Sequence, residues 1–320
     1  TTEIYTLSLH DALPICRIIL VFIAIIAGSF NATADDEVEK GQCILTFSLP
    51  FGVISNIKVT EISETVRTNQ DSTKASWSDT TIYYMTRLIK NPPQDGFQTA
   101  TITIDSVFFL PGTPTGIPMD RSESIKSTCL EGKTADITYS PYGEIAKIEG
   151  KDLDWIRNYL EDGAGEISEE TYYDWQQCLS DSRIASVFDM KKIILPQGLI
   201  PTDTIWTCPI EFYAAGKRFS DSLACKIVKL DQREYNISTS SLFVNNIDQD
   251  AHFYGIEKIG KINSAKGVGI MNITLSRRGT LSKTSLEYRI ATENTANSIK
   301  FKENIHTQIQ WEVLRSLKYE

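Results

Sequence analysis

The chain has 320 residues, and 32 Lys and Arg stand against 41 Asp and Glu, so its formal net charge is −9. Hydrophobic residues make up 41% and charged residues 23%, a balance typical of a folded soluble protein and too apolar for a disordered one. The acidic excess argues against a nucleic-acid binder, because phosphate contacts need clustered Lys and Arg. Three histidines leave little room for His-based metal or acid–base chemistry.

Residues 1–15 read TTEIYTLSLHDALPI and match one reading frame of a short-read sequencing adapter. We interpret them as an artefact of assembled environmental (metagenomic) DNA and exclude them from the fold, as an expression scar would be excluded. His10 is excluded with them, which leaves His252 and His306.

Residues 16–34 have the pattern of a truncated signal peptide. Arg17 precedes an apolar run at residues 18–28, which is shorter than the ~20 residues that a membrane span needs. The small residues Ala32 and Ala34 predict cleavage near Ala34. We therefore expect an exported protein, periplasmic or extracellular, with no membrane span in the mature chain.

The cysteines fit an oxidising compartment, where an odd number leaves at least one thiol unpaired or paired between chains. Cys208 and Cys225 fall on consecutive predicted strands around Gly216, so a disulfide across this hairpin is one expectation. Their spacing does not match a structural zinc site, and we expect no metal and no cofactor. Beyond the leader the cysteines are Cys43, Cys129, Cys178, Cys208 and Cys225.

Residues 35–150 are predicted to form a first β half. Apolar residues alternate with others over residues 43–51, which is the pattern of a half-buried strand. Residues 82–85 and 99–109 are rich in β-branched and aromatic residues, and the Pro- and Gly-containing stretch at 91–96 predicts the turn between them. The alternating apolar residues are Cys43, Leu45, Phe47, Leu49 and Phe51.

Residues 151–196 are predicted to form a central helical insert. Leu153, Ile156 and Leu160 recur at helical spacing, and a second helix is expected after Ser168, which has the side chain of an N-cap. Ile184 and its neighbours predict a third helix that ends before Pro196.

Residues 197–320 are predicted to form a second β half. In its last strand the apolar residues face one way and His306 belongs to the polar face, as in an antiparallel sheet with one buried side. The sequence at 137–147 also aligns with that at 273–283, and each unit has the pattern of a strand, a turn with Gly and a second strand. A duplication and convergent hairpin chemistry both explain this match. The buried face is expected to carry Ile305, Thr307, Ile309, Trp311 and Val313.

The run at residues 132–150 resembles a pattern in uncharacterised exported β-rich bacterial proteins, which contain a domain of unknown function. In these proteins a strand of this kind precedes a helical segment, and a "P…GD-x-W" opening starts a second β half. Residues 201–206 match that opening in part, with Thr202 where Gly is expected. Such layouts are similar to lipoprotein-carrier half-barrels, whose curved antiparallel sheet holds an apolar ligand under helices. The resemblance implies a mostly β (α+β) fold with a curved antiparallel sheet or half-barrel in two β halves.

Sequence motifs of common enzymes are missing. The chain has no GxSxG, P-loop, GxGxxG or HExxH motif, and Ser55 and Lys58 satisfy S-x-x-K only within a predicted strand. Acidic residues cluster between 149 and 181, where a solvated helical face is favoured over a pair of glycosidase carboxylates or a calcium loop. We therefore expect a non-enzymatic protein.

Aromatic residues of the helical insert suggest a site. Trp155 and Tyr159 lie beside the apolar stripe of the first helix, and Trp175 lies on the second. One interpretation is a helical lid that closes over an apolar ligand or lipid, and the other is that these rings pack the helices onto the sheet. The alternative function is a structural or protein-interaction module of the cell envelope, with an envelope protein as partner.

Overall fold

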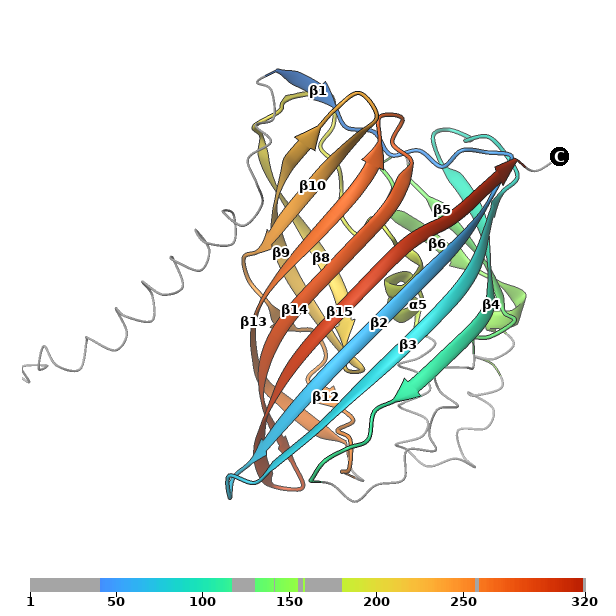
Figure 1. Cartoon of the computed structure of the whole chain (residues 1–320). Coiled ribbons are helices and arrows are strands. Elements are labelled where there is room, and N and C mark those ends of the chain that lie inside the picture. The colour runs from blue at the N-terminus through green and yellow to red at the C-terminus, as the bar shows by residue number, and fades with distance from the viewer. Residues whose placement is uncertain are drawn as a thin grey trace, which may run out of the picture. The chain divides into compact units, whose positions relative to one another are not determined.

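Antiparallel strands make up most of the structure, a computed structural model that describes residues 41–116, 130–140, 142–154, 158, 180–256 and 259–318 (Figure 1). All of these residues belong to one unit, Val38–Glu320. The elements are β1 (Gln42–Ile44), β2 (Val53–Asn69), β3 (Lys74–Ile89), β4 (Gln98–Pro111), β5 (Thr134–Tyr139), β6 (Ile145–Glu149), α5 (Asp181–Phe188), β7 (Leu199–Pro201), β8 (Ile205–Ala214), β9 (Lys217–Leu230), β10 (Glu234–Ser241), β11 (Asn245–Asn246), β12 (Asp250–Ala251), β13 (Gly260–Ser276), β14 (Leu281–Ala296) and β15 (Ile299–Lys318).

One large sheet contains nearly all of the strands. Its order is β9-β10-β13-β14-β15-β2-β3-β4-β5-β6, with β8 along the other side of β9, and β1 pairs separately with β7. Every pairing between these strands is antiparallel. The β15–β2 pair joins strands from the two predicted β halves. The expected class, a mostly β protein with a large antiparallel sheet, is confirmed.

The sheet is open, because its edge strands β6 and β8 do not pair with each other among the described residues. Helix α5 lies between these edges and contacts both, on the far side of the long strands in Figure 1. On that inner face the Trp311 indole Nε1 donates a hydrogen bond to the Val187 carbonyl at 2.8 Å. No helix in the described part of the chain is long and apolar enough to cross a membrane.

The last strand shows how the sequence builds this inner face. Ile305, Thr307, Ile309 and Trp311 are all buried, and the residues between them are exposed or half-exposed, so the predicted alternation of β15 is confirmed. His306 lies on the outer, polar face, also as predicted. Alternate residues of a strand point to opposite faces, so each long strand adds one stripe to a shared core.

The prediction of a strand over residues 43–51 is wrong for most of its length. β1 ends at Ile44, and residues 45–49, which we call the strap, cross one end of the sheet instead of pairing within it. The Ser48 amide donates to the Gly279 carbonyl, and the Tyr235 hydroxyl donates to the Thr46 carbonyl. Leu45 and Leu49 are buried in the core, so alternation predicted the buried side chains but not the hydrogen-bond partners.

The two hairpins with similar sequences share one turn geometry. Gly143 and Gly279 both have a φ of +81°, a left-handed conformation that Gly adopts without a steric penalty. In each turn a serine hydroxyl, of Ser140 or Ser276, accepts a hydrogen bond from the amide four residues later. The aligned segments therefore fold alike at the turn between β5 and β6 and at the turn between β13 and β14.

The third predicted helix is confirmed as α5. Ser180 caps it by accepting a hydrogen bond from the Arg183 amide, and Ile184, Val187 and Phe188 point into the core. Residues 151–154 are helical, with Leu153 buried. Residue 158 is also helical. The other residues of the predicted first helix, the second helix, the signal peptide and residues 1–15 lie outside the described residues.

Candidate functional site

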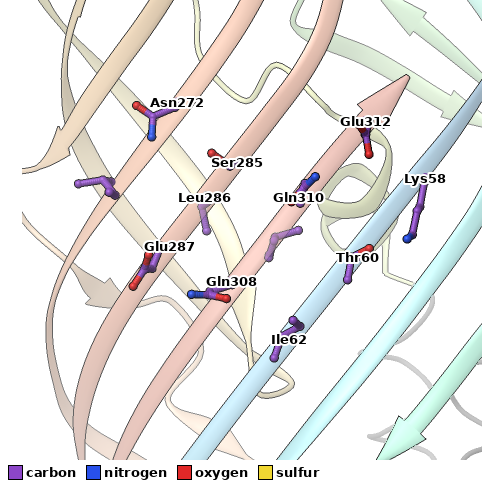
Figure 2. A pocket seen from close by; sticks show the side chains of 12 residues that line it. Lys58, Thr60, Ile62, Asn272, Ser285, Leu286, Glu287, Gln308, Gln310 and Glu312 are labelled. Atoms are coloured by element: carbon purple, nitrogen blue, oxygen red, sulfur yellow. The ribbon is translucent and has the colours of Figure 1, made fainter. Parts of the chain in front are cut away.

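A shallow trough crosses the outer face of the sheet, opposite α5, over β13, β14, β15 and β2 (Figure 2). Its volume is about 440 Å³. Ligand sites are concave and combine an apolar floor with a few polar groups that fix orientation. The polar side chains that line the trough are Lys58, Thr60, Asn272, Ser285, Glu287, Gln308, Gln310 and Glu312.

The middle row of the trough follows from strand register. Asn272 on β13 lies opposite Ser285 on β14, and Ser285 lies opposite Gln310 on β15. Gln310 in turn lies opposite Thr60 on β2. Side chains directly opposite in neighbouring strands project from the same face, so these four residues form one row across four strands.

Longer side chains flank this row and make it a hollow. On one side Glu287 lies opposite Gln308, and on the other Glu312 lies opposite Lys58. Ser285 in the middle row is short, so the flanking side chains stand higher than its hydroxyl. The lining residues come from four neighbouring strands, so the trough extends across all four.

The polar groups of the trough are available for a ligand. Apart from Glu287, none of its polar side chains forms a hydrogen bond or ion pair with another described residue. The Lys58 Nζ lies 5.9 Å from the centroid of the Tyr84 ring on β3. The row thus offers amide and hydroxyl groups that can both donate and accept hydrogen bonds.

Charged residues mark one margin of the trough. The His306 ring lies between two carboxylates, with Nε2 at 2.9 Å from Glu287 and Nδ1 at 3.4 Å from Glu64. Arg289 also lies 3.6 Å from Glu287. These contacts hold the Glu287 carboxylate toward its neighbours, so the uncommitted groups are Gln308 and those of the middle row and the opposite flank.

On the inner face, by contrast, large described side chains pack closely against one another. Trp311, Tyr288 and Phe212 have no exposed surface, and the rings of Phe212 and Tyr288 stack with centroids 4.0 Å apart. Gly269 on β13 lies opposite Tyr288, and a Cβ there would meet the Tyr288 ring at 2.4 Å. The glycine therefore makes room for the ring.

Three buried cations lie near the end of α5. Burial lowers the pKa of Lys192 to about 8, and its Nζ donates to the Ser186 carbonyl and lies over the Trp311 ring. Burial also lowers the pKa of Lys191, whose Nζ donates to the Tyr142 carbonyl at 2.6 Å. The third, Arg87, is 4% exposed, and its Nε has no hydrogen-bond partner.

The predicted ligand-binding residues Trp155, Tyr159 and Trp175 lie outside the residues that the structure describes. The predicted lid over an apolar ligand therefore stays a prediction. The acidic cluster at residues 149–181 lies mostly in the same segment.

The cysteines predicted to pair lie on adjacent strands. Cys208 and Cys225 are both buried and both free thiols in this structure. Cys208 lies opposite Leu223, and Cys225 lies opposite Trp206, so the two are diagonal neighbours, for which Cα atoms are about 7–8 Å apart. Burial raises the pKa of Cys225 to about 12 and also raises that of Cys208. The disulfide stays a prediction.

Sequence reasoning missed the trough. Its residues come from both ends of the chain, and they meet only because β15 pairs with β2. The alternation of β15 places Gln308 and Gln310 on the polar face, but it does not predict which side chains lie beside them. The described residues contain no group of three or more His, Cys, Asp or Glu that could hold a metal ion.

Comparisons with known proteins add a coarse likeness only. No protein-family model matches the chain, and no curated protein matches it in sequence. A crystal structure of Neisserial surface protein A is similar over 86% of this chain and 99% of its own, with 6% identity and a TM-score of 0.21. An outer membrane channel from Pseudomonas putida F1 is similar over 88% of this chain and 100% of its own, with 8% identity and a TM-score of 0.23.

Proposed function

We propose that the protein is an exported, non-enzymatic binding module of the cell envelope, which binds its ligand in the trough on the outer face of the sheet. The carrying observation is the row of Asn272, Ser285, Gln310 and Thr60, whose polar groups have no partner among the described residues. The leader-like residues 16–34 support export, with cleavage near Ala34 and a periplasmic or extracellular location. The close packing of described inner-face residues such as Trp311, Tyr288 and Phe212 favours the outer face as the place where a ligand binds.

A photo-crosslinking experiment in intact cells tests this proposal. A photoreactive phenylalanine analogue is placed at Gln310 in the trough or at Asn304, an exposed outer-face position on the same strand. We expect a crosslinked envelope component from position 310 and none from position 304. Equal products from both positions, or no product from either, would contradict the proposal.

The second candidate is a carrier of an apolar ligand or lipid beneath a helical lid. Its support is the large apolar core on the inner face, to which α5 is joined by the hydrogen bond from the Trp311 indole to the Val187 carbonyl. Extraction of the purified protein with organic solvent, followed by lipid mass spectrometry, distinguishes the two candidates. Stoichiometric lipid would favour the carrier, and its absence would leave the surface-binding module.

A further inference from the structure

The rows of the trough continue onto an apolar surface of β3 and β4. Thr60 at the end of the middle row lies opposite Ile82, and Ile82 lies opposite Phe108. Lys58 on the flank lies opposite Tyr84. Together Ile82, Tyr84 and Phe108 form what we call the platform.

The platform offers aromatic surface to solvent. Phe108 is 51% exposed, and the Tyr84 and Phe108 rings lie edge to face with centroids 6.0 Å apart. Exposed aromatic rings can contribute to ligand binding, because removing their surface from water is favourable. A ligand that needs both an apolar contact and many hydrogen bonds fits the trough and the platform together.

We propose that the trough and platform bind an extended, uncharged oligosaccharide that lies across the strands; this inference rests on the proposed function of the trough. Sugar rings have hydroxyl edges, which suit the amides of Gln310 and Asn272 and the hydroxyl of Ser285. They also have C–H faces, which suit the ring of Phe108.

The distance between neighbouring strands supports a glycan that lies across them. Neighbouring strands lie about 4.8 Å apart, which is close to the length of one sugar residue in an extended glycan. The row from Asn272 to Phe108 crosses six strands, so it is roughly 24 Å long. An extended peptide advances about 3.3 Å per residue, so its side chains would fall out of step with the rows.

The charges that line the trough favour an uncharged ligand. The trough holds the carboxylates of Glu287 and Glu312 and the single ammonium of Lys58, and Glu287 is already paired with His306 and Arg289. This balance disfavours a polyanion such as a uronate chain or a phosphate-rich polymer, because two carboxylates stand against the one ammonium of Lys58. Neutral hydroxyl and acetamido groups carry no such cost.

Isothermal titration calorimetry of the full chain with soluble hexasaccharides tests the inference. The probes are cellohexaose and chitohexaose, with hexamannuronate as the anionic comparison and an extended neutral hexapeptide as the peptide comparison. We expect at least one neutral hexasaccharide to bind and neither comparison to bind in the trough.

Variants locate the binding site. Gln310→Ala should weaken binding about tenfold, the loss expected for hydrogen bonds at a ligand, and Ser285→Tyr should abolish it by filling the trough. Phe108→Ala should weaken it several-fold. Asn304→Ala removes an exposed amide from the outer face of the same strand and should leave binding unchanged. Equal melting temperatures would show that all four variants are folded.

Three results would overturn the inference. The first is that neither neutral hexasaccharide binds. The second is that Ser285→Tyr leaves binding intact. The third is that only the peptide or the anionic chain binds in the trough. The crosslinking experiment separates this failure from failure of the proposed function. If position 310 crosslinks to a protein but no oligosaccharide binds, the proposed binding module stands and the oligosaccharide inference fails.

Discussion

At the scale of single residues, the buried Lys192 makes the stability of the protein depend on pH. Its folded pKa of about 8 lies below the ordinary value of 10.5, so the folded state releases this proton first as the pH rises. Its destabilising effect is therefore complete below pH 8 and fades between pH 8 and 10.5. We expect the stability of the natural protein, relative to Lys192→Met, to rise by about 3 kcal/mol across that window.

Urea unfolding at several pH values measures this difference. Lys302→Met is the control, because Lys302 pairs with Glu293 on the exposed outer face, where ion pairs contribute little. If the difference in unfolding free energy between Lys192→Met and the natural protein does not change from pH 8 to 10.5, the buried lysine keeps its proton over that range.

Arg87 is a buried cation without a carboxylate partner among the described residues. Its only hydrogen bond there runs from Nη1 to the Met190 sulfur at 4.0 Å, and burial lowers its pKa. Buried charges are costly unless they are paired. We therefore expect Arg87→Met to raise the free energy of unfolding by about 1–3 kcal/mol.

Arg183→Met is the matched comparison for this prediction. The Arg183 guanidinium donates to both oxygens of Glu61, at 3.0 and 2.6 Å, so its removal leaves a partly buried carboxylate unpaired and should destabilise the protein. Chemical denaturation measures both variants. Destabilisation by Arg87→Met as large as that by Arg183→Met would show that the Arg87 charge is compensated in the folded protein.

At the scale of elements, the strap depends on the turn it crosses. A Cβ at Gly279 would lie 2.4 Å from the Thr46 carbonyl oxygen, whereas a Cβ at Gly216 would meet nothing within 4 Å. Both glycines have positive φ, so Ala at either position costs about 1 kcal/mol through the backbone. Gly279→Ala should cost about 2 kcal/mol more, because the strap must also move.

Thermal unfolding and amide exchange check the strap prediction together. Gly279→Ala should speed exchange of the Ser48 amide, which donates to the Gly279 carbonyl, and Gly216→Ala should not. Equal costs for the two variants, with Ser48 still protected, would mean that the strap adapts without loss.

The same elements show what sequence patterns can and cannot predict. Alternation predicted that Trp311 and His306 lie on opposite faces, and the helical spacing of Ile184 and its neighbours predicted α5, because these signals are local. The strap was predicted as a strand because Leu45 and Leu49 are buried at period two whether or not a neighbour pairs with them. The trough needs the β15–β2 register, which is set by contacts between distant parts of the chain.

At the scale of the whole molecule, one buried carboxylate joins strands that are far apart in the order of the sheet. Glu303 on β15 has no exposed surface, accepts two hydrogen bonds from Arg67 on β2 and lies 3.1 Å from the Lys217 Nζ at the start of β9. β9 is far from β2 in the strand order, so this contact brings two distant parts of the sheet together. Burial alone would raise the pKa of Glu303, but Lys217 and Arg67 outweigh it and lower that pKa.

Glu303→Gln should therefore cost about 3–5 kcal/mol at neutral pH, because it leaves two buried cations without their anion. Because the pKa of Glu303 is lowered in the folded state, its contribution is present above the ordinary value of 4.5 and is lost as the pH falls below it. Urea unfolding measures the cost, with Glu293→Gln as an exposed control on β14. The double variant Glu303→Gln, Lys217→Met should recover part of the loss, because only Arg67 then remains uncompensated. A double variant no more stable than the single one would show that Lys217 and Glu303 do not interact energetically, and that other contacts hold β9 against β15.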